Sequence, residues 1–260
     1  LNGYASIKVR VSSGQDFAEH SIDIETRNPS KLINQSFEAF VESGKVWEHP
    51  LDVFGSSGTN NTSIEISTIP PLGLDKRLSY LIRYPHGCIE QTTSSVFPQL
   101  VLENLTELSA EQKINIRENI NSSIKKIKRF QLNSGGFSYW EGNSYISDWG
   151  TTYAGHFLIK AKEYGYFVSD HVFNNWLSYQ KNTANTWSVS ANYHNLGAIK
   201  SQAYRLFSLA LAGSSEIGAM NRLKEIKHLP STVKALLAAS YYLNGQTSIA
   251  GRLANTIDLD

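Results

Sequence analysis

The chain has 260 residues, of which 41% are hydrophobic and 18% are charged, and its 24 Lys and Arg residues nearly balance 23 Asp and Glu residues. This composition supports a folded core large enough for two domains and excludes a disordered or fibrous chain. The formal net charge of +1 gives no electrostatic reason to expect nucleic acid as a partner, and no apolar run approaches the ~20 residues that span a bilayer.

A single cysteine, Cys88, limits the chemistry that the chain can perform. One thiol cannot form an intrachain disulfide or a site built from several thiolates, and the histidines show no metal-ligand spacing. We therefore predict no metal site and no other cofactor. The chain begins with Leu1 instead of Met, so we expect it to be a piece of a longer polypeptide.

The first 70 residues are predicted to form β-strands. Apolar and polar residues alternate over 7–11 and again over 22–25, as in half-buried antiparallel strands. Shorter alternating runs follow at 37–41 and 64–69. The sequence therefore predicts a β-sandwich-like domain over residues 1–70.

The pattern changes at Pro70-Pro71, beyond which apolar residues recur at helical spacing. The clearest apolar stripe is formed by Ile116, Ile120, Ile124 and Ile127. We predict an all-α domain over 71–260 with helices at 73–83, 88–103, 110–132, 149–164, 169–181, 197–212, 215–227, 231–243 and 247–257. Glycine follows three of these helices, at Gly165, Gly213 and Gly245, where it suits a left-handed cap. The domain is therefore predicted to be a run of helical hairpins.

The segment from Pro85 to Gln91 carries the most specific signal. Pro85 disfavours helix at the residue before it, and Gly87 frees the backbone where a new helix begins. Cys88 then falls at a helix N-terminus, where the partial positive charge favours the nucleophilic thiolate. Gln91 lies three residues on and hence on the same helix face, with the two Cβ atoms about 5–6 Å apart. A thiol and a carboxamide are thus close enough to react.

This segment resembles the Gly-Cys-x-Glu-Gln thioester motif of the α2-macroglobulin and complement family. All four fixed positions are present, as Gly87, Cys88, Glu90 and Gln91. The resemblance to the bacterial branch covers most of residues 70–180 and includes the segments Gly-Gly-Phe-Ser-Tyr-Trp at 135–140 and Asp-Trp-Gly-Thr-Thr-Tyr at 148–153.

The resemblance implies a fold and a mechanism. It implies that residues 71–260 form an α/α-toroid, which we expect to be incomplete because the family's ring has more helices, preceded by β-domain material. In the family, the cysteine sulfur attacks the glutamine carbonyl, ammonia leaves, and a cyclic thioester remains. Cleavage of a bait segment elsewhere in the parent protein then lets a lysine amine of the target protease attack the carbonyl of Gln91, which gives an amide crosslink.

A domain of this kind would be a covalent trap, an endopeptidase inhibitor instead of a turnover enzyme. By the same resemblance, its partners would be target proteases, its location the periplasm or cell envelope, and its parent protein lipid-anchored. Nucleic acid and a direct membrane span are not expected.

An intact thioester must be shielded from water by apolar or aromatic cover, and Tyr84 and His86 are the nearest candidates. Many bacterial relatives have a tyrosine at the position of His86, so two roles stay open for this residue, an aromatic lid or a base in acyl transfer. His194 falls in roughly the region where complement-type relatives have a histidine for transfer to hydroxyl groups. The alternative for His194 is a surface-loop residue.

Glu90 has two interpretations. It could help to polarise the Gln91 amide, or it could simply be a first-turn acidic residue that is favourable at the helix dipole. His156 lies among apolar and aromatic residues and is predicted to be a core histidine with a satisfied ring.

Two other functions compete with a thioester trap. Helical hairpin rings also form carbohydrate-active enzymes, in which exposed aromatic residues stack on sugars and a facing carboxylate pair supplies acid and base. The candidates for these roles are Tyr139, Trp140, Tyr145 and Trp149 for stacking and Glu141 and Asp148 for catalysis. A cysteine hydrolase is the third hypothesis, and it requires a histidine beside Cys88.

Overall fold

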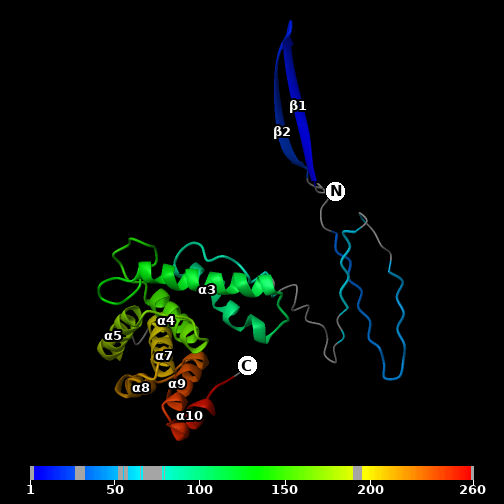
Figure 1. The fold of residues 1–260 in the computed structure, drawn as a ribbon. Helices are drawn as coiled ribbons and strands as arrows, with labels where there is room; N and C mark the ends of the chain where they lie inside the picture. Colours follow the sequence, from blue (N-terminus) through cyan, green and yellow to red (C-terminus); the bar gives the residue numbers. More distant parts are fainter. Residues whose placement is uncertain are drawn as a thin grey trace. The chain divides into compact units, whose positions relative to one another are not determined.

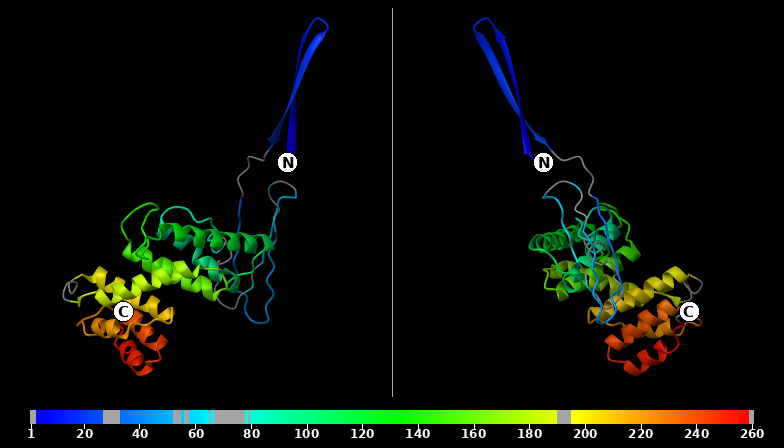
Figure 2. Two further views of the ribbon diagram at one scale, coloured as in Figure 1. Left: turned by 60° about the vertical axis from the view of Figure 1, so that its left-hand side comes forward. Right: turned by 90° about the vertical axis from the view of Figure 1, so that its right-hand side faces the viewer.

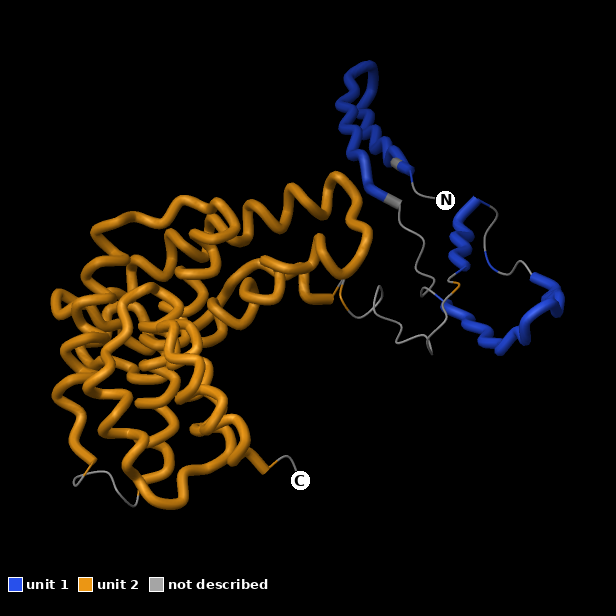
Figure 3. The backbone as a smooth tube through the Cα atoms, turned by 90° about the horizontal axis from the view of Figure 1, so that it is seen from below, with its two compact units in different colours: residues 1–64 blue, residues 65–260 orange. Residues whose placement is uncertain are grey.

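A computed structural model describes residues 3–26, 33–51, 55, 58–64, 66, 78, 80–189 and 195–258. The chain divides into two compact units, residues 1–64 and residues 65–260 (Figure 3). The domain boundary predicted at Pro70-Pro71 lies outside the described residues, and so does most of the helix predicted at 73–83.

The described part of the first unit contains one β-hairpin, formed by β1 (Gly3–Ser13) and β2 (Asp16–Thr26). The strands are antiparallel with Ile7 opposite Ile22, which confirms the strands predicted from the alternation. The two-residue turn begins with Gly14 at φ 63°, the first central position where hairpin turns of type II′ require glycine.

The strand predicted at 37–41 is not formed, because the described residues 33–51 contain no strand. Alternation of side chains predicts which face of a strand is apolar, but the strand itself requires a neighbour for its backbone groups. In the described part of the first unit the hairpin is the only sheet, and its apolar residues Ile7, Val9 and Ile22 are about half exposed. The described residues of this unit therefore form one sheet, whereas a β-sandwich consists of two.

The second unit is helical (Figures 1 and 2). Its described elements are α2 (Ile89–Val96), η1 (Pro98–Asn104), α3 (Ala110–Phe130), α4 (Asp148–Glu163), α5 (Asp170–Thr186), α7 (Leu196–Leu211), α8 (Ile217–Lys224), α9 (Ser231–Leu243) and α10 (Thr247–Ala254). Helices α2, α4, α7 and α9 pack side by side in this order, and α3, α5, α8 and α10 alternate with them along the chain. This alternation of two helical layers is that of an α/α-toroid. No helix in the described residues is long and apolar enough to cross a membrane.

The helix predicted over 88–103 is interrupted at Pro98, and this boundary corrects the sequence-based one. Proline has no N–H to continue the α-helical hydrogen bonds, so α2 ends at Val96 and the chain continues as the 3-10 helix η1. The other helices match their predicted ranges more closely, and α9 has the predicted bounds.

Burial and helix caps follow the sequence pattern. In the predicted stripe on α3, Ile116, Ile120 and Ile127 are buried and Ile124 is partly buried against the same core. The three predicted glycine caps all have positive φ, at 82°, 67° and 77° for Gly165, Gly213 and Gly245. The residue after each glycine donates its N–H to a carbonyl five residues back, which is the Schellman motif that ends a helix before a tight turn.

A buried polar network joins three helices of this unit. Arg205 on α7 is 2% exposed, donates from Nε to Gln180 Oε1 at 3.0 Å, and pairs with Asp148 and Gln202. Gln180 on α5 donates in turn to Thr152 Oγ1 on α4 at 3.0 Å. Because a buried guanidinium is costly without partners, these contacts fix how α4, α5 and α7 pack.

Candidate functional site

Cys88 is the N-cap residue of α2, as the sequence predicts. Its backbone is extended, with φ −70° and ψ 176°, and the Gln91 N–H donates to its Sγ at 3.5 Å. The Gln91 side chain folds back so that its Oε1 accepts the Cys88 N–H at 3.1 Å. These reciprocal contacts form a capping box in which a thiol takes the place of the usual hydroxyl. The structure thus brings together the two residues that are predicted to react.

A second capping box, at the start of α3, has the same hydrogen bonds but a serine in place of the cysteine. The Ser109 N–H donates to Gln112 Oε1 at 2.8 Å, and the Gln112 N–H donates to Ser109 Oγ at 3.2 Å. Ser109 is exposed and Gln112 is partly buried, whereas Cys88 is only 1% exposed. The two boxes therefore share backbone geometry and differ in the nucleophile and in its burial.

Gly87 makes the close approach of Gln91 possible. Its φ is 84°, in the left-handed region that favours glycine. A Cβ at this position would lie 1.9 Å from Gln91 Oε1 and 2.8 Å from Gln91 Cδ. Gly87 is thus required both by the backbone and by the amide group packed against it.

The start of α2 is held by the loop that precedes α4 and by α4 itself. The Ile89 N–H donates to the Tyr139 carbonyl at 3.1 Å, and the Ile89 side chain is fully buried. A Cβ at Gly150, in the first turn of α4, would be 2.7 Å from Ile89 Cγ2, so the two helix starts are in direct contact. These contacts fix the helix end that carries Cys88.

The sequence predicts sugar stacking as a role for Tyr139, whereas the structure places this residue beside the start of α2. Its hydroxyl donates to Glu90 Oε2 at 3.3 Å. The Cys88 sulfur beside this hydroxyl, followed by burial and the Glu90 carboxylate, raises the pKa of Tyr139 from 10.0 to about 12. The signal in the sequence was the segment at 135–140, which is part of the family resemblance although it lies far from the motif along the chain.

Tyr84 and His86 lie side by side just before the motif, with ring centroids 4.7 Å apart. Both are exposed, Tyr84 to 57%, and Gln91 is exposed as well. Their roles as shield or base stay predictions. His194, the more distant candidate, lies outside the described residues.

The carboxylates of the carbohydrate-enzyme hypothesis are each paired with a different arginine. Glu141 forms an exposed ion pair with Arg129 at 3.5 Å, and Asp148 pairs with the buried Arg205. The third hypothesis needs a histidine at the thiol, but the hydrogen bond that the described residues give to the Cys88 sulfur comes from the Gln91 N–H. These contacts favour thiol and amide chemistry over either hydrolase.

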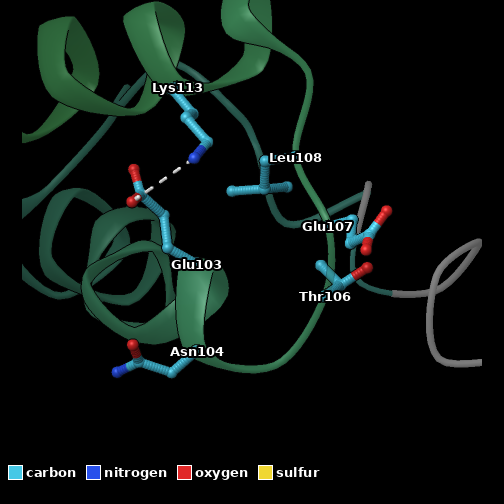
Figure 4. Close-up of a pocket in the computed structure, with 6 residues that line it drawn as sticks. All are labelled: Glu103, Asn104, Thr106, Glu107, Leu108 and Lys113. Atoms are coloured by element: carbon cyan, nitrogen blue, oxygen red, sulfur yellow. Dashed lines mark ion pairs between the residues drawn. The ribbon is translucent and has the colours of Figure 1, made fainter.

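One pocket in the described part of the chain is lined by other residues. It measures about 520 Å³ and lies between the end of η1 and the start of α3 (Figure 4). Its lining includes an exposed ion pair of Lys113 with Glu103 at 3.9 Å, and none of the predicted site residues.

His156 is the core histidine that the sequence predicts. Its Nδ1 is 2.9 Å from the Tyr204 hydroxyl, and the Phe97 ring meets its edge at a centroid distance of 4.9 Å. Burial, followed by the charge of Lys160, lowers the pKa of His156 from 6.5 to about 4. The imidazole is therefore neutral at pH 7 in the folded chain.

This lowered pKa makes stability depend on pH. Between pH 6.5 and about pH 4 the unfolded chain binds a proton at His156 that the folded chain does not bind, so stability falls as the pH falls through this window. We expect the urea midpoint of unfolding to fall less between pH 7 and pH 4 in a His156→Phe variant than in the unsubstituted chain. His171→Phe, at an exposed position on α5, is the matched control, and equal slopes for all three chains would contradict the expectation.

Comparisons with known proteins agree with the motif. A family model described as the A-macroglobulin TED domain matches residues 58–247. The α2-macroglobulin of Escherichia coli K12 is 30% identical over 155 residues, which cover 56% of this chain and 9% of that protein.

Two solved structures show the same fold. Salmonella α2-macroglobulin reacted with methylamine superposes with a TM-score of 0.61 at 26% identity, and the match covers 73% of this chain and 13% of that chain. Trypsin-activated α2-macroglobulin from Escherichia coli superposes with a TM-score of 0.58 at 24% identity and covers 66% and 13%. The chain thus spans about a tenth of the length of the proteins to which it is similar.

Proposed function

The chain belongs to the A-macroglobulin TED domain family, and from this premise we propose that Cys88 and Gln91 form an internal thioester that captures amines covalently. The observation that carries the proposal is the hydrogen bond from the Cys88 N–H to Gln91 Oε1 at 3.1 Å. This bond holds the Gln91 side-chain carbonyl close to the thiol of Cys88.

Thioester formation is an acyl transfer within this capping box. The Cys88 sulfur forms a bond to Gln91 Cδ, and negative charge develops on Oε1 as the tetrahedral intermediate forms. The Cys88 N–H and the positive end of the α2 dipole stabilise that charge, as an oxyanion hole does. The C–N bond then breaks, and the thiol proton leaves on nitrogen as part of ammonia.

Capture of an amine reverses the order of bonds. A neutral amine attacks Gln91 Cδ, the C–S bond breaks, and an amide and a free Cys88 thiol remain, with the proton lost by the amine accounting for the thiol proton. Gln91 is exposed whereas Cys88 is buried. In the thioester, the acyl carbon from Gln91 would therefore be accessible to solvent, and the sulfur would be covered. Attack from solvent is therefore directed to the carbonyl.

At the level of the parent protein, we propose a protease trap. Cleavage of a bait segment outside this chain would expose the thioester to a lysine of the protease, in the periplasm or cell envelope. The structure of an Escherichia coli relative in a trypsin-activated form supports a response to proteases in the family fold, and the Salmonella relative reacted with methylamine supports the use of this small amine as a probe.

Intact mass of the 260-residue chain tests the thioester directly. We expect a mass that is one ammonia short of the sequence value, and a gain of one methylamine together with one titratable thiol after treatment. Cys88→Ala is expected to have its full sequence mass and to incorporate no methylamine. A full mass and a free thiol in the untreated, unsubstituted chain would contradict the proposal.

The second capping box provides a matched control for geometry alone. In a Cys88→Ala background, Ser109→Cys places the chain's single thiol three residues before Gln112, at the start of α3. We expect no mass deficit, because this site is exposed to water and Leu108 replaces the glycine that precedes Cys88. A mass deficit in this variant would show that a capping box is sufficient and that the surroundings of Cys88 contribute nothing.

A further inference from the structure

The lead-in segment, residues 83–87, is held by side chains instead of by secondary structure. Residues 82–86 form neither helix nor strand, so their carbonyls need other hydrogen-bond donors. Alternate carbonyls of the lead-in segment receive one side-chain donor each, from η1, α3 and α2. The bonds are Gln99 Nε2 to the Arg83 carbonyl at 2.9 Å, Lys126 Nζ to the Pro85 carbonyl at 3.4 Å, and Thr92 Oγ1 to the Gly87 carbonyl at 3.4 Å.

Gln99 has the most complete set of contacts among these donors, and it is only 1% exposed. Its Nε2 donates to the Arg83 carbonyl at 2.9 Å and to the Ser95 carbonyl, near the end of α2, at 2.7 Å. Its Oε1 accepts from Asn119 Nδ2 on α3 at 3.1 Å. Because backbone carbonyls only accept hydrogen bonds, they fix which way the Gln99 amide faces. One buried amide thus ties together the chain on both sides of the thioester motif.

The lead-in segment ends at the peptide bond between Gly87 and Cys88, which contacts the reacting amide. The N–H of this peptide donates to Gln91 Oε1 at 3.1 Å, and its carbonyl accepts the Thr92 hydroxyl at 3.4 Å. Glycine adopts many backbone conformations, so Gly87 does not fix the orientation of the peptide by itself. The orientation depends on how the preceding residues are held, and Gln99 makes the shortest of the three bonds to their carbonyls.

We propose that Gln99 is a positioning residue of the thioester, which holds the lead-in segment so that the Cys88 N–H stays on the Gln91 carbonyl and the sulfur stays covered. This role rests on the proposed thioester function. Asn119 supports it by keeping the Gln99 amide in its orientation. Pro85 and Cys88 are both buried, so release of the lead-in segment would let water reach the thioester from the side of the sulfur.

The lifetime of the thioester in the 260-residue chain tests this role. Gln99→Met removes both donors and keeps an unbranched side chain of similar length. We expect the thioester of this variant to hydrolyse at pH 7 about 5-fold faster or more, because two hydrogen bonds that hold the lead-in segment are lost. Intact mass follows the reaction as a gain of one water, together with one titratable thiol. A rate equal to that of the unsubstituted chain would overturn the role of Gln99.

Gln202→Met is the matched control for loss of a buried glutamine. Gln202 is 0% exposed, its Nε2 donates to the Ala184 carbonyl at 3.0 Å, and its Oε1 accepts from Arg205, so its contacts join α7 to α5. We expect this variant to lower the urea midpoint of unfolding and to leave hydrolysis at the unsubstituted rate. Equal acceleration in Gln202→Met and Gln99→Met would show that stability alone sets the lifetime, against the proposal.

Asn119→Leu is a milder variant of the same network. It leaves Gln99 Oε1 without its donor, and we expect a smaller acceleration of hydrolysis than in Gln99→Met. Because Asn119 acts through Gln99, the double variant is expected to hydrolyse no faster than Gln99→Met alone. Accelerations that multiply in the double variant would contradict the link from Asn119 through Gln99 to the site.

A separate measurement keeps this role distinct from the thioester itself. In chains whose Cys88 is a free thiol, we expect iodoacetamide to alkylate Gln99→Met several-fold faster than Gln202→Met at pH 7. The rate should hardly change with urea below the unfolding transition, because the lead-in segment opens locally, whereas exposure by global unfolding would rise steeply with urea.

The two measurements fail in different ways. A full mass in the untreated, unsubstituted chain would refute the thioester, and the alkylation rates would still decide whether Gln99 keeps the Cys88 sulfur covered. Equal alkylation rates in Gln99→Met and Gln202→Met, together with an ammonia deficit in the unsubstituted chain, would refute the role of Gln99 alone.

Discussion

Replacement of Gly87 by alanine is expected to abolish the mass deficit and the incorporation of methylamine. The added Cβ would lie 1.9 Å from Gln91 Oε1, so the amide must leave the position in which the Cys88 N–H holds it. An L-residue at φ 84° also strains the backbone by about 1–2 kcal/mol. The chain should still fold, because this strain is small beside the burial in the helical core. Intact mass with and without methylamine is the measurement.

Gly142→Ala separates the clash from the strain. Gly142 has the same φ of 84°, but a Cβ there would have no atom within 4 Å. We expect this variant to lose a similar amount of stability and to keep both the ammonia deficit and the reaction with methylamine. A Gly87→Ala chain that retains the deficit would show that the amide does not need its place against residue 87.

Replacement of Arg205 by alanine is expected to cause the largest loss of stability, about 3 kcal/mol or more. Arg205 is 2% exposed, and its removal leaves a cavity and takes the donor away from Gln180 Oε1, Gln202 and Asp148. Urea unfolding followed by helical circular dichroism measures the change, because the network lies in the helical unit.

Arg129→Ala is the control for loss of an arginine as such. Its ion pair with Glu141 is exposed, with side chains 59% and 50% accessible, and such pairs contribute about 0–1 kcal/mol. Urea midpoints that fall equally in the two variants would show that the network around Arg205 does not hold α4, α5 and α7 together.

Much of the helical unit could be predicted because its local signals agree with one another. The isoleucine stripe on α3 and the glycines at 165, 213 and 245 each report on a few neighbouring residues, and the structure confirms them. The predicted helix at 88–103 is too long, because proline at position 98 ends the α-helical hydrogen bonding although apolar residues continue beyond it. The strand at 37–41 was wrong, because alternation says nothing about whether a partner strand is present.

The buried network could have been suspected but not resolved. Gln202 and Arg205 lie three residues apart on the face of α7 that also carries Ile199, Ala203 and Leu206, a face that the apolar spacing predicts to be buried. Their partners Gln180 and Asp148 come from two other helices, so only the packing of α4, α5 and α7 could identify them.

By itself, the sequence determined the family, the helical character of the second unit, and the pair of residues proposed to react. Cys88 and Gln91 are three residues apart at a helix start, and one turn of helix is enough to bring such side chains together. Only the tertiary structure decided what surrounds that pair. Tyr139 is 51 residues away from Cys88 along the chain, and its hydroxyl reaches Glu90 because the loop before α4 accepts the Ile89 N–H at the start of α2. Contacts of this kind depend on helix packing, which no local pattern of residues encodes.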